Sequence, residues 1–125
     1  MTVHTAIDAA AGVVTHTVVG DLGIDDFQQA FALRPTLPDF KPGMRVLWDL
    51  SQANASRIST DEIRRIAHLN KSHVKKTGVG YKIAFVAPRD IEYGLARMYQ
   101  MFSAETPVEN RVFRTIEEAQ RWLSP

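Results

Sequence analysis

The chain has 125 residues, of which 45 % are hydrophobic and 23 % charged, and this composition excludes a disordered chain and allows a sizeable core in a single domain over residues 1–125. The net charge of +1 argues against a nucleic-acid binder, because such proteins carry clearly basic domains. Without cysteine, a disulfide framework and a catalytic thiolate are both excluded. No signal-peptide pattern or apolar run of about 20 residues occurs, so we expect a cytoplasmic protein without a membrane span.

The N-terminal third predicts a β-hairpin followed by a helix. Residues 3–7 and 13–19 are short β-rich runs joined by small residues around Gly12, so we expect two antiparallel strands, the first at a sheet edge. Apolar residues then recur at helical spacing from Ile24 until Pro35 ends the helix. A stiff, proline-rich loop leads into the next strand.

The central segment reads as a buried strand, a polar loop and a capped helix. The apolar run over residues 46–50 is typical of a strand that a sheet buries on both faces, and polar residues interrupt it from Asp49 onward. Ser59 and Glu62 have the spacing of a capping box, in which each side chain accepts the other residue's backbone N–H. We expect the helix over residues 60–77.

The C-terminal half alternates strands and helices. Residues 81–87 and 111–114 predict strands; a helix over residues 89–104 follows the first, and a helix capped by Thr115 follows the second. The helix over residues 89–104 is expected to bury one stripe, formed by Ile91, Leu95, Met98 and Phe102.

The predicted order of elements is β-β-α-β-α-β-α-β-α. Strands that alternate with helices call for right-handed crossovers and a mainly parallel sheet. We therefore predict an α/β fold with a five-stranded, mostly parallel sheet, an antiparallel N-terminal edge strand and four helices.

Two stretches carry a resemblance to a known family. The strand that ends in Trp48-Asp49-Leu50-Ser51 and the C-terminal VFRTIEEAQRWL, taken with the order of elements, resemble the SpoIIAA-like proteins of the STAS/SEC14 group. The resemblance covers nearly the whole chain. It implies a β/α superhelix shared by anti-sigma factor antagonists, the STAS domains of anion transporters and the lipid-binding CRAL-TRIO domains.

The sequence departs from the antagonists at their regulatory motif. In those proteins the strand leads to an Asp-Ser-Ser-Gly type motif, whose serine at the helix start is phosphorylated by a partner kinase. Here the corresponding residues read Arg57-Ile58-Ser59-Thr60-Asp61. The hydroxyls stand at about the right place, but the preceding acid and the glycine are missing, which argues against a phosphoswitch of that kind.

Little in the sequence points to catalysis or to a metal. His68 and His73 lie five residues apart on one expected helix, so they do not share a face. His4 and His16 can face each other across the hairpin, and we interpret them as a cross-strand surface pair. The glycines near residue 78 precede a strand, where a phosphate-binding loop would follow one. We therefore predict a non-catalytic protein without metal or cofactor.

The helix over residues 60–77 carries a basic face opposite its apolar side. A solvated face with cations near a helix C-terminus is one interpretation, and a surface for an acidic protein or anionic lipid head groups is the other. The basic face consists of Arg64, His68, Lys71 and Lys75, with Arg65 beside them.

The helix over residues 89–104 has more apolar side chains than one buried stripe requires. The surplus indicates partial exposure, a self-association patch or the wall of a pocket. The residues concerned are Tyr93, Met98, Tyr99 and Met101.

In mainly parallel sheets, ligands and partners meet the loops at the carboxyl ends of the strands. Here this rim is expected to consist of Asp49, Ser51, Arg57, Ser59 and Thr60, with Arg89 near by. An interaction domain that binds a protein partner or a second copy fits these features. The resemblance implies the alternative, a CRAL-TRIO type carrier of a small apolar or anionic ligand.

Overall fold

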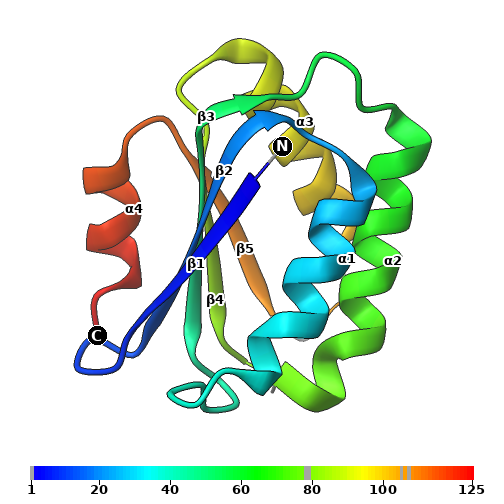
Figure 1. The fold of residues 1–125 in the computed structure, drawn as a ribbon. Coiled ribbons are helices and arrows are strands. Elements are labelled where there is room, and N and C mark those ends of the chain that lie inside the picture. Colours follow the sequence, from blue (N-terminus) through cyan, green and yellow to red (C-terminus); the bar gives the residue numbers. More distant parts are fainter. Residues whose placement is uncertain (1, 78–79, 105, 107) are drawn as a thin grey trace.

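The computed structural model describes residues 2–77, 80–104, 106 and 108–125, and of residues 2 and 72–77 it describes the backbone alone. The described part forms a five-stranded sheet in the order β1-β2-β3-β4-β5 (Figure 1). β1 pairs with β2 in the antiparallel sense, and the other neighbours are parallel. The predicted α/β architecture is thus confirmed. The strands are β1 Thr2–Asp8, β2 Val13–Asp21, β3 Arg45–Asn54, β4 Lys82–Val86 and β5 Glu109–Phe113.

Helices cover both faces of the sheet. α1 (Ile24–Leu33), α2 (Thr60–Thr77) and α3 (Asp90–Phe102) pack on one face and form the larger core. α4 (Ile116–Leu123) packs on the other face, at the left in Figure 1, over a smaller core. A short 3₁₀ turn, Arg34–Thr36, ends α1 at Pro35, as the sequence predicted.

β3 lies at the centre because both of its faces are apolar. Val46 and Trp48 point into the larger core, Leu47 points toward α4, and each is at most 2 % exposed. This alternation follows from the two-residue period of a strand. The prediction of a strand buried on both faces is confirmed.

α2 begins at Ser59 through the predicted capping box. The Ser59 hydroxyl accepts the backbone N–H of Glu62 at 3.2 Å, and the Glu62 carboxylate accepts the backbone N–H of Ser59 at 3.1 Å. The buried side of the helix carries Ile63, Ile66 and Ala67. Thr115 caps α4, since its hydroxyl accepts the backbone N–H of Glu118 at 3.3 Å.

β3 is longer than the sequence indicated, and this changes the expected loop. The strand continues to Asn54, pairing with β2 beyond a bulge near Val19, so Asp49 and Ser51 belong to the strand and not to the loop. β4 ends opposite Asp49, so the last part of β3 pairs only with β2 among the described strands and tolerates polar residues.

The predicted stripe of α3 is confirmed in part, since Leu95, Met98 and Phe102 pack against the core and Ile91 does not. Glu92, Ala96 and Tyr99 are its buried residues, whereas Ile91 is 54 % exposed. The full burial of Glu92 and Tyr99 was not predicted, because both satisfy their polar atoms inside the protein, which an apolar pattern does not record. Leu95, Met98 and Phe102 are only partly buried against the core.

His16 is buried, so the prediction of a surface pair with His4 was wrong. The hairpin register places Thr5, not His4, opposite His16. The imidazole is 0 % exposed and stacks on Trp48 with 4.2 Å between ring centroids. Its Nε2 accepts a hydrogen bond of 3.2 Å from Nε of Arg34, which is itself only 1 % exposed.

Candidate interaction site

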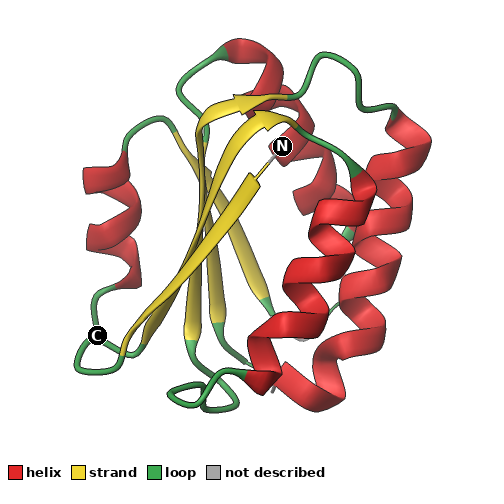
Figure 2. Cartoon of the chain, in the orientation of Figure 1, coloured by secondary structure: helices red, strands yellow, loops and turns green. Residues whose placement is uncertain are grey.

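The loop that joins β3 to α2 lies at the carboxyl end of the sheet, at the top of Figure 2. It spans residues 55–59 and is held from beneath by two buried side chains, Ala55 and Ile58. Between and after them, Arg57 and Ser59 are exposed. Apolar residues thus fix the path of the loop, and its polar residues face the solvent.

A buried carboxylate ties this loop to α3. Glu92 is 1 % exposed, and its two oxygens accept from the backbone N–H of Ala55 at 3.0 Å and from Nε of Arg89 at 2.7 Å. Arg89 also donates to the carbonyl of Ala53 at 2.9 Å. The hydrogen bond from the Ala55 N–H to this charged group contributes about 1.5–3 kcal/mol, and the pair with Arg89 contributes less because the Arg89 side chain is 59 % exposed. The base of the loop is therefore rigidly connected to the start of α3.

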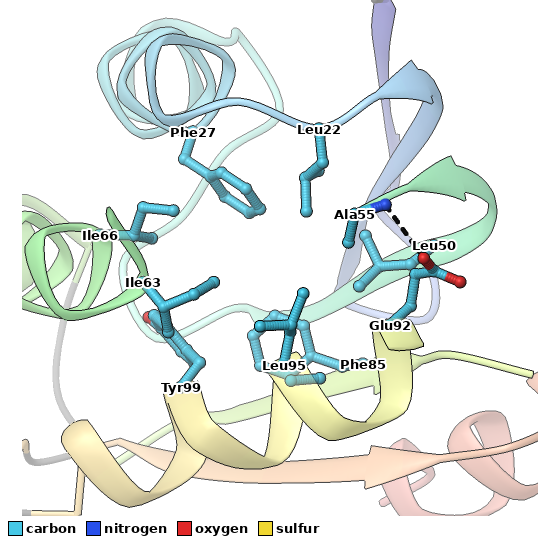
Figure 3. A pocket seen from close by; sticks show the side chains of 11 residues that line it. Leu22, Phe27, Leu50, Ala55, Ile63, Ile66, Phe85, Glu92, Leu95 and Tyr99 are labelled. Atoms are coloured by element: carbon cyan, nitrogen blue, oxygen red, sulfur yellow. Dashed lines mark hydrogen bonds between the residues drawn. The ribbon is translucent and has the colours of Figure 1, made fainter. Parts of the chain in front are cut away.

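An apolar crevice lies beneath the loop, between α1, α2 and α3. Figure 3 shows side chains such as Phe27, Ile63 and Leu95 converging on it, with Glu92 at one side. Its free volume is about 20 Å³. A water molecule needs roughly 10–15 Å³ on this measure, so the crevice holds a guest of that size and no more.

The structure brings together only part of the expected rim. Arg57, Ser59 and Thr60 are neighbours on the exposed loop and helix start, and Arg89 lies at the base of the loop. Arg57 forms an exposed ion pair of 3.7 Å with Asp21, which contributes little to stability.

Asp49 and Ser51 do not belong with this group. Trp48 and Leu50 on either side of Asp49 point into the larger core, so Asp49 projects from the opposite, α4-bearing face of the sheet. Its carboxylate accepts from both the backbone N–H and the hydroxyl of Ser51, at 3.0 and 2.7 Å.

The described residues of the basic face of α2 are exposed, and only some of them line a common hollow. Arg64, His68 and Lys71 line a surface hollow of about 300 Å³ between α2 and the end of α3. Arg65 is exposed but is not among the residues that line this hollow. The side chain of Lys75 lies outside the described residues.

The surplus apolar residues of α3 do not form one patch. Tyr99 is buried and its hydroxyl accepts from the Asn70 side chain at 2.8 Å, and burial raises its pKa to about 12. The ring of Tyr93 lies 3.9 Å from the guanidinium carbon of Arg114. Met98 is partly buried, and Met101 is 73 % exposed.

A comparison with solved structures identifies the arrangement. The crystal structure of an uncharacterized protein from the DUF3478 family with a SpoIIAA-like fold, from Shewanella loihica PV-4, matches 98 % of this chain and 92 % of its own with a TM-score of 0.58. This chain has a SpoIIAA-like fold. The two sequences are 19 % identical, a level at which the likeness shows the fold alone. No protein-family model and no curated protein matches the sequence.

Besides His16, Glu92 and Arg34 of this SpoIIAA-like fold are buried although no local pattern in the sequence marks them as buried. Glu92 lies in the first turn of α3, three residues after Arg89. An acidic residue is common there because it interacts favourably with the helix macrodipole, so its presence does not indicate burial. Arg34 precedes Pro35 at a helix end, a position that looks exposed in the sequence. Their burial depends on partners from distant segments, which no local pattern records.

The described residues include neither a metal site nor a membrane-spanning helix. Within the described ranges, no three His, Asp or Glu side chains are grouped closely enough to hold a metal ion. No described helix has the length and apolar character needed to cross a bilayer.

Proposed function

We propose that the protein is a non-catalytic, cytoplasmic interaction domain of the STAS type that binds a protein partner through its rim. By the rim we mean the exposed surface of residues 55–60 together with Arg89. The observation that carries the proposal is the anchoring of this exposed loop by the buried carboxylate of Glu92. A loop held in one conformation binds with a smaller loss of conformational entropy than a loop that must first be ordered.

The electrostatics of the rim favour an acidic group on the partner. Ser59 opens a helix of 18 residues, whose N-terminus attracts negative charge by about 0.3–1 kcal/mol. Arg57 adds a positive charge two residues earlier, and its pairing with Asp21 is exposed and readily exchanged. Arg57 is the group that suits a carboxylate or phosphate of the partner, because the Glu62 carboxylate already accepts the backbone N–H and the hydroxyl of Ser59.

Substitutions at Ser59 test the proposal. Aspartate is also a good N-cap residue, so Ser59→Asp should preserve the helix while placing a negative charge where an acidic partner group would bind. We expect it to reduce capture of the partner that co-purifies with the wild type from its own cells. Ser59→Ala should cost about 1 kcal/mol of stability and leave capture nearly intact.

A matched control is available on the other face of the sheet. Gln120 is exposed on α4, so Gln120→Glu adds one negative charge far from the rim. The proposal requires that this variant capture the partner as well as the wild type does. If Ser59→Asp stays folded and captures the partner undiminished, the rim is not the binding surface.

A carrier of the CRAL-TRIO type is the second candidate, and the apolar lining of the crevice is the observation that favours it. With about 20 Å³ free, an acyl chain would have to separate α1, α2 and α3 to enter. Native mass spectrometry of freshly purified protein tests this function. A retained acyl or isoprenoid mass supports the carrier, and a bare protein mass supports the interaction domain.

A further inference from the structure

The hollow between α2 and α3 is built from residues that do not belong to the rim. It is lined by Arg64, Ala67, His68, Lys71, Phe102 and Thr106. Its volume of about 300 Å³ lies at the lower end of the range for small-molecule sites. The hollow therefore has room for a compact ligand.

Its polar groups are hydrogen-bond donors. Arg64, His68 and Lys71 stand at positions i, i+4 and i+7 of α2, which places them on one helix face over about 10 Å. None of the described residues that line the hollow is acidic. Asp61 contacts Arg64 at 3.2 Å, but both side chains are exposed, so this pair is weak.

Phe102 positions the strongest of these donors. The guanidinium carbon of Arg64 lies 4.9 Å from the centroid of the Phe102 ring, within the range of a cation–π contact. The ring limits the orientations of the guanidinium before a ligand arrives. Arginine has five N–H donors, and the contact with Asp61 occupies one nitrogen, so a bidentate contact to another anion remains open.

We propose that this hollow binds a soluble phosphorylated small molecule. An ionised phosphate group accepts hydrogen bonds and donates none, so it suits a site made of donors. Its oxygens match the planar, two-pronged guanidinium of arginine and the point charge of lysine. The concave shape and the limited volume favour a compact ligand over the surface of a bilayer. The binding group is the phosphate, whichever molecule bears it.

Calorimetric titration with inorganic pyrophosphate at low ionic strength tests the proposal. We expect saturable binding at one site, and about tenfold or greater weakening in both Arg64→Ala and Lys71→Ala, because each removes a charge-assisted hydrogen bond. Arg65→Ala is the matched control, since it removes the same charge from the same helix outside the hollow. It should change the affinity by less than about twofold.

A second arm distinguishes a soluble ligand from a lipid head group. Co-sedimentation with phosphatidylglycerol vesicles should remain weak at salt concentrations where pyrophosphate still binds, and circular dichroism should show that each variant is folded. Three results would overturn the proposal: no heat of binding to the wild type at millimolar pyrophosphate, equal weakening by Arg65→Ala and Arg64→Ala, or binding to vesicles without binding to pyrophosphate.

Discussion

His16 is an uncharged side chain held next to a cation in the core. Because Nε2 accepts from Arg34, the imidazole proton resides on Nδ1, which donates to the hydroxyl of Thr5 at 2.8 Å. Burial, and then the positive charge of Arg34, hold the pKa of His16 well below its ordinary value of 6.5. Protonation would remove the acceptor and place two positive charges side by side in the core.

This arrangement predicts that acid destabilises the protein. Below about pH 6.5 the unfolded chain binds a proton that folded His16 does not, so the free energy of unfolding should fall, by at most about 1.4 kcal/mol per pH unit from this group. Urea unfolding at several pH values measures the slope. His16→Gln should flatten it, and His4→Gln, at an exposed position, should not. Equal slopes in the wild type and His16→Gln would contradict this role.

Glu92 is expected to stabilise both the fold and the loop at the rim. Glu92→Ala leaves the N–H of Ala55 without its acceptor and should cost about 1–3 kcal/mol in the free energy of unfolding. Hydrogen exchange at the Ala55 amide should accelerate as well. Glu117→Ala, at an exposed position of α4, is the control and should change stability by less than about 0.5 kcal/mol. Unchanged exchange at Ala55 in Glu92→Ala would show that the carboxylate does not hold the loop.

At the scale of elements, the orientation of α3 can be tested through Tyr99. Tyr99→Phe removes the acceptor of the Asn70 side chain, which is 1 % exposed, and should cost about 1–3 kcal/mol. Met101→Ala, on the exposed side of the same helix, should stay within about 0.5 kcal/mol of the wild type. Thermal or urea unfolding compares the two. A larger loss in Met101→Ala than in Tyr99→Phe would mean that α3 presents another side to the core.

The elements themselves were largely predictable from the sequence. Capping residues and apolar periodicity correctly located α2 from Thr60 to Thr77, and β-rich runs correctly located the hairpin and the order of elements along the chain. The end of β3 and the full burial of Glu92 on α3 were not predictable. Both depend on polar residues, such as Ser51 and Glu92, whose environment is decided by neighbouring strands and helices.

In the candidate site, too, contacts between residues distant in the sequence were not predictable. The exposed residues of the loop, Arg57 and Ser59, follow from the position of the loop between a strand and a capped helix. The contact of Glu92 with Ala55 joins residues 37 positions apart, and no spacing rule predicts such a pair. The exposed position of Arg57 and Ser59 was therefore predictable from the sequence, and the hydrogen bonds by which Glu92 holds the loop were not.

At the scale of the whole molecule, the two proposed surfaces share one helix. Thr60, the first residue of α2, belongs to the rim, and the middle of the helix lines the hollow that includes Lys71 and Phe102. The other face of the sheet carries α4 and none of the residues of either surface. Partner binding is thus expected on the side of the molecule that carries α1, α2 and α3.

Site-specific photo-crosslinking in the native cells tests the central proposal most directly. A photoreactive amino acid replaces Ser56 on the rim in one variant and Gln120 on α4 in another, and both positions are exposed, so neither should disturb the fold. We expect irradiation to give a discrete higher-mass adduct from position 56 and none from position 120. An adduct from position 120 alone, or no adduct from position 56 while the variant is folded, would contradict the assignment of the rim as the interaction surface.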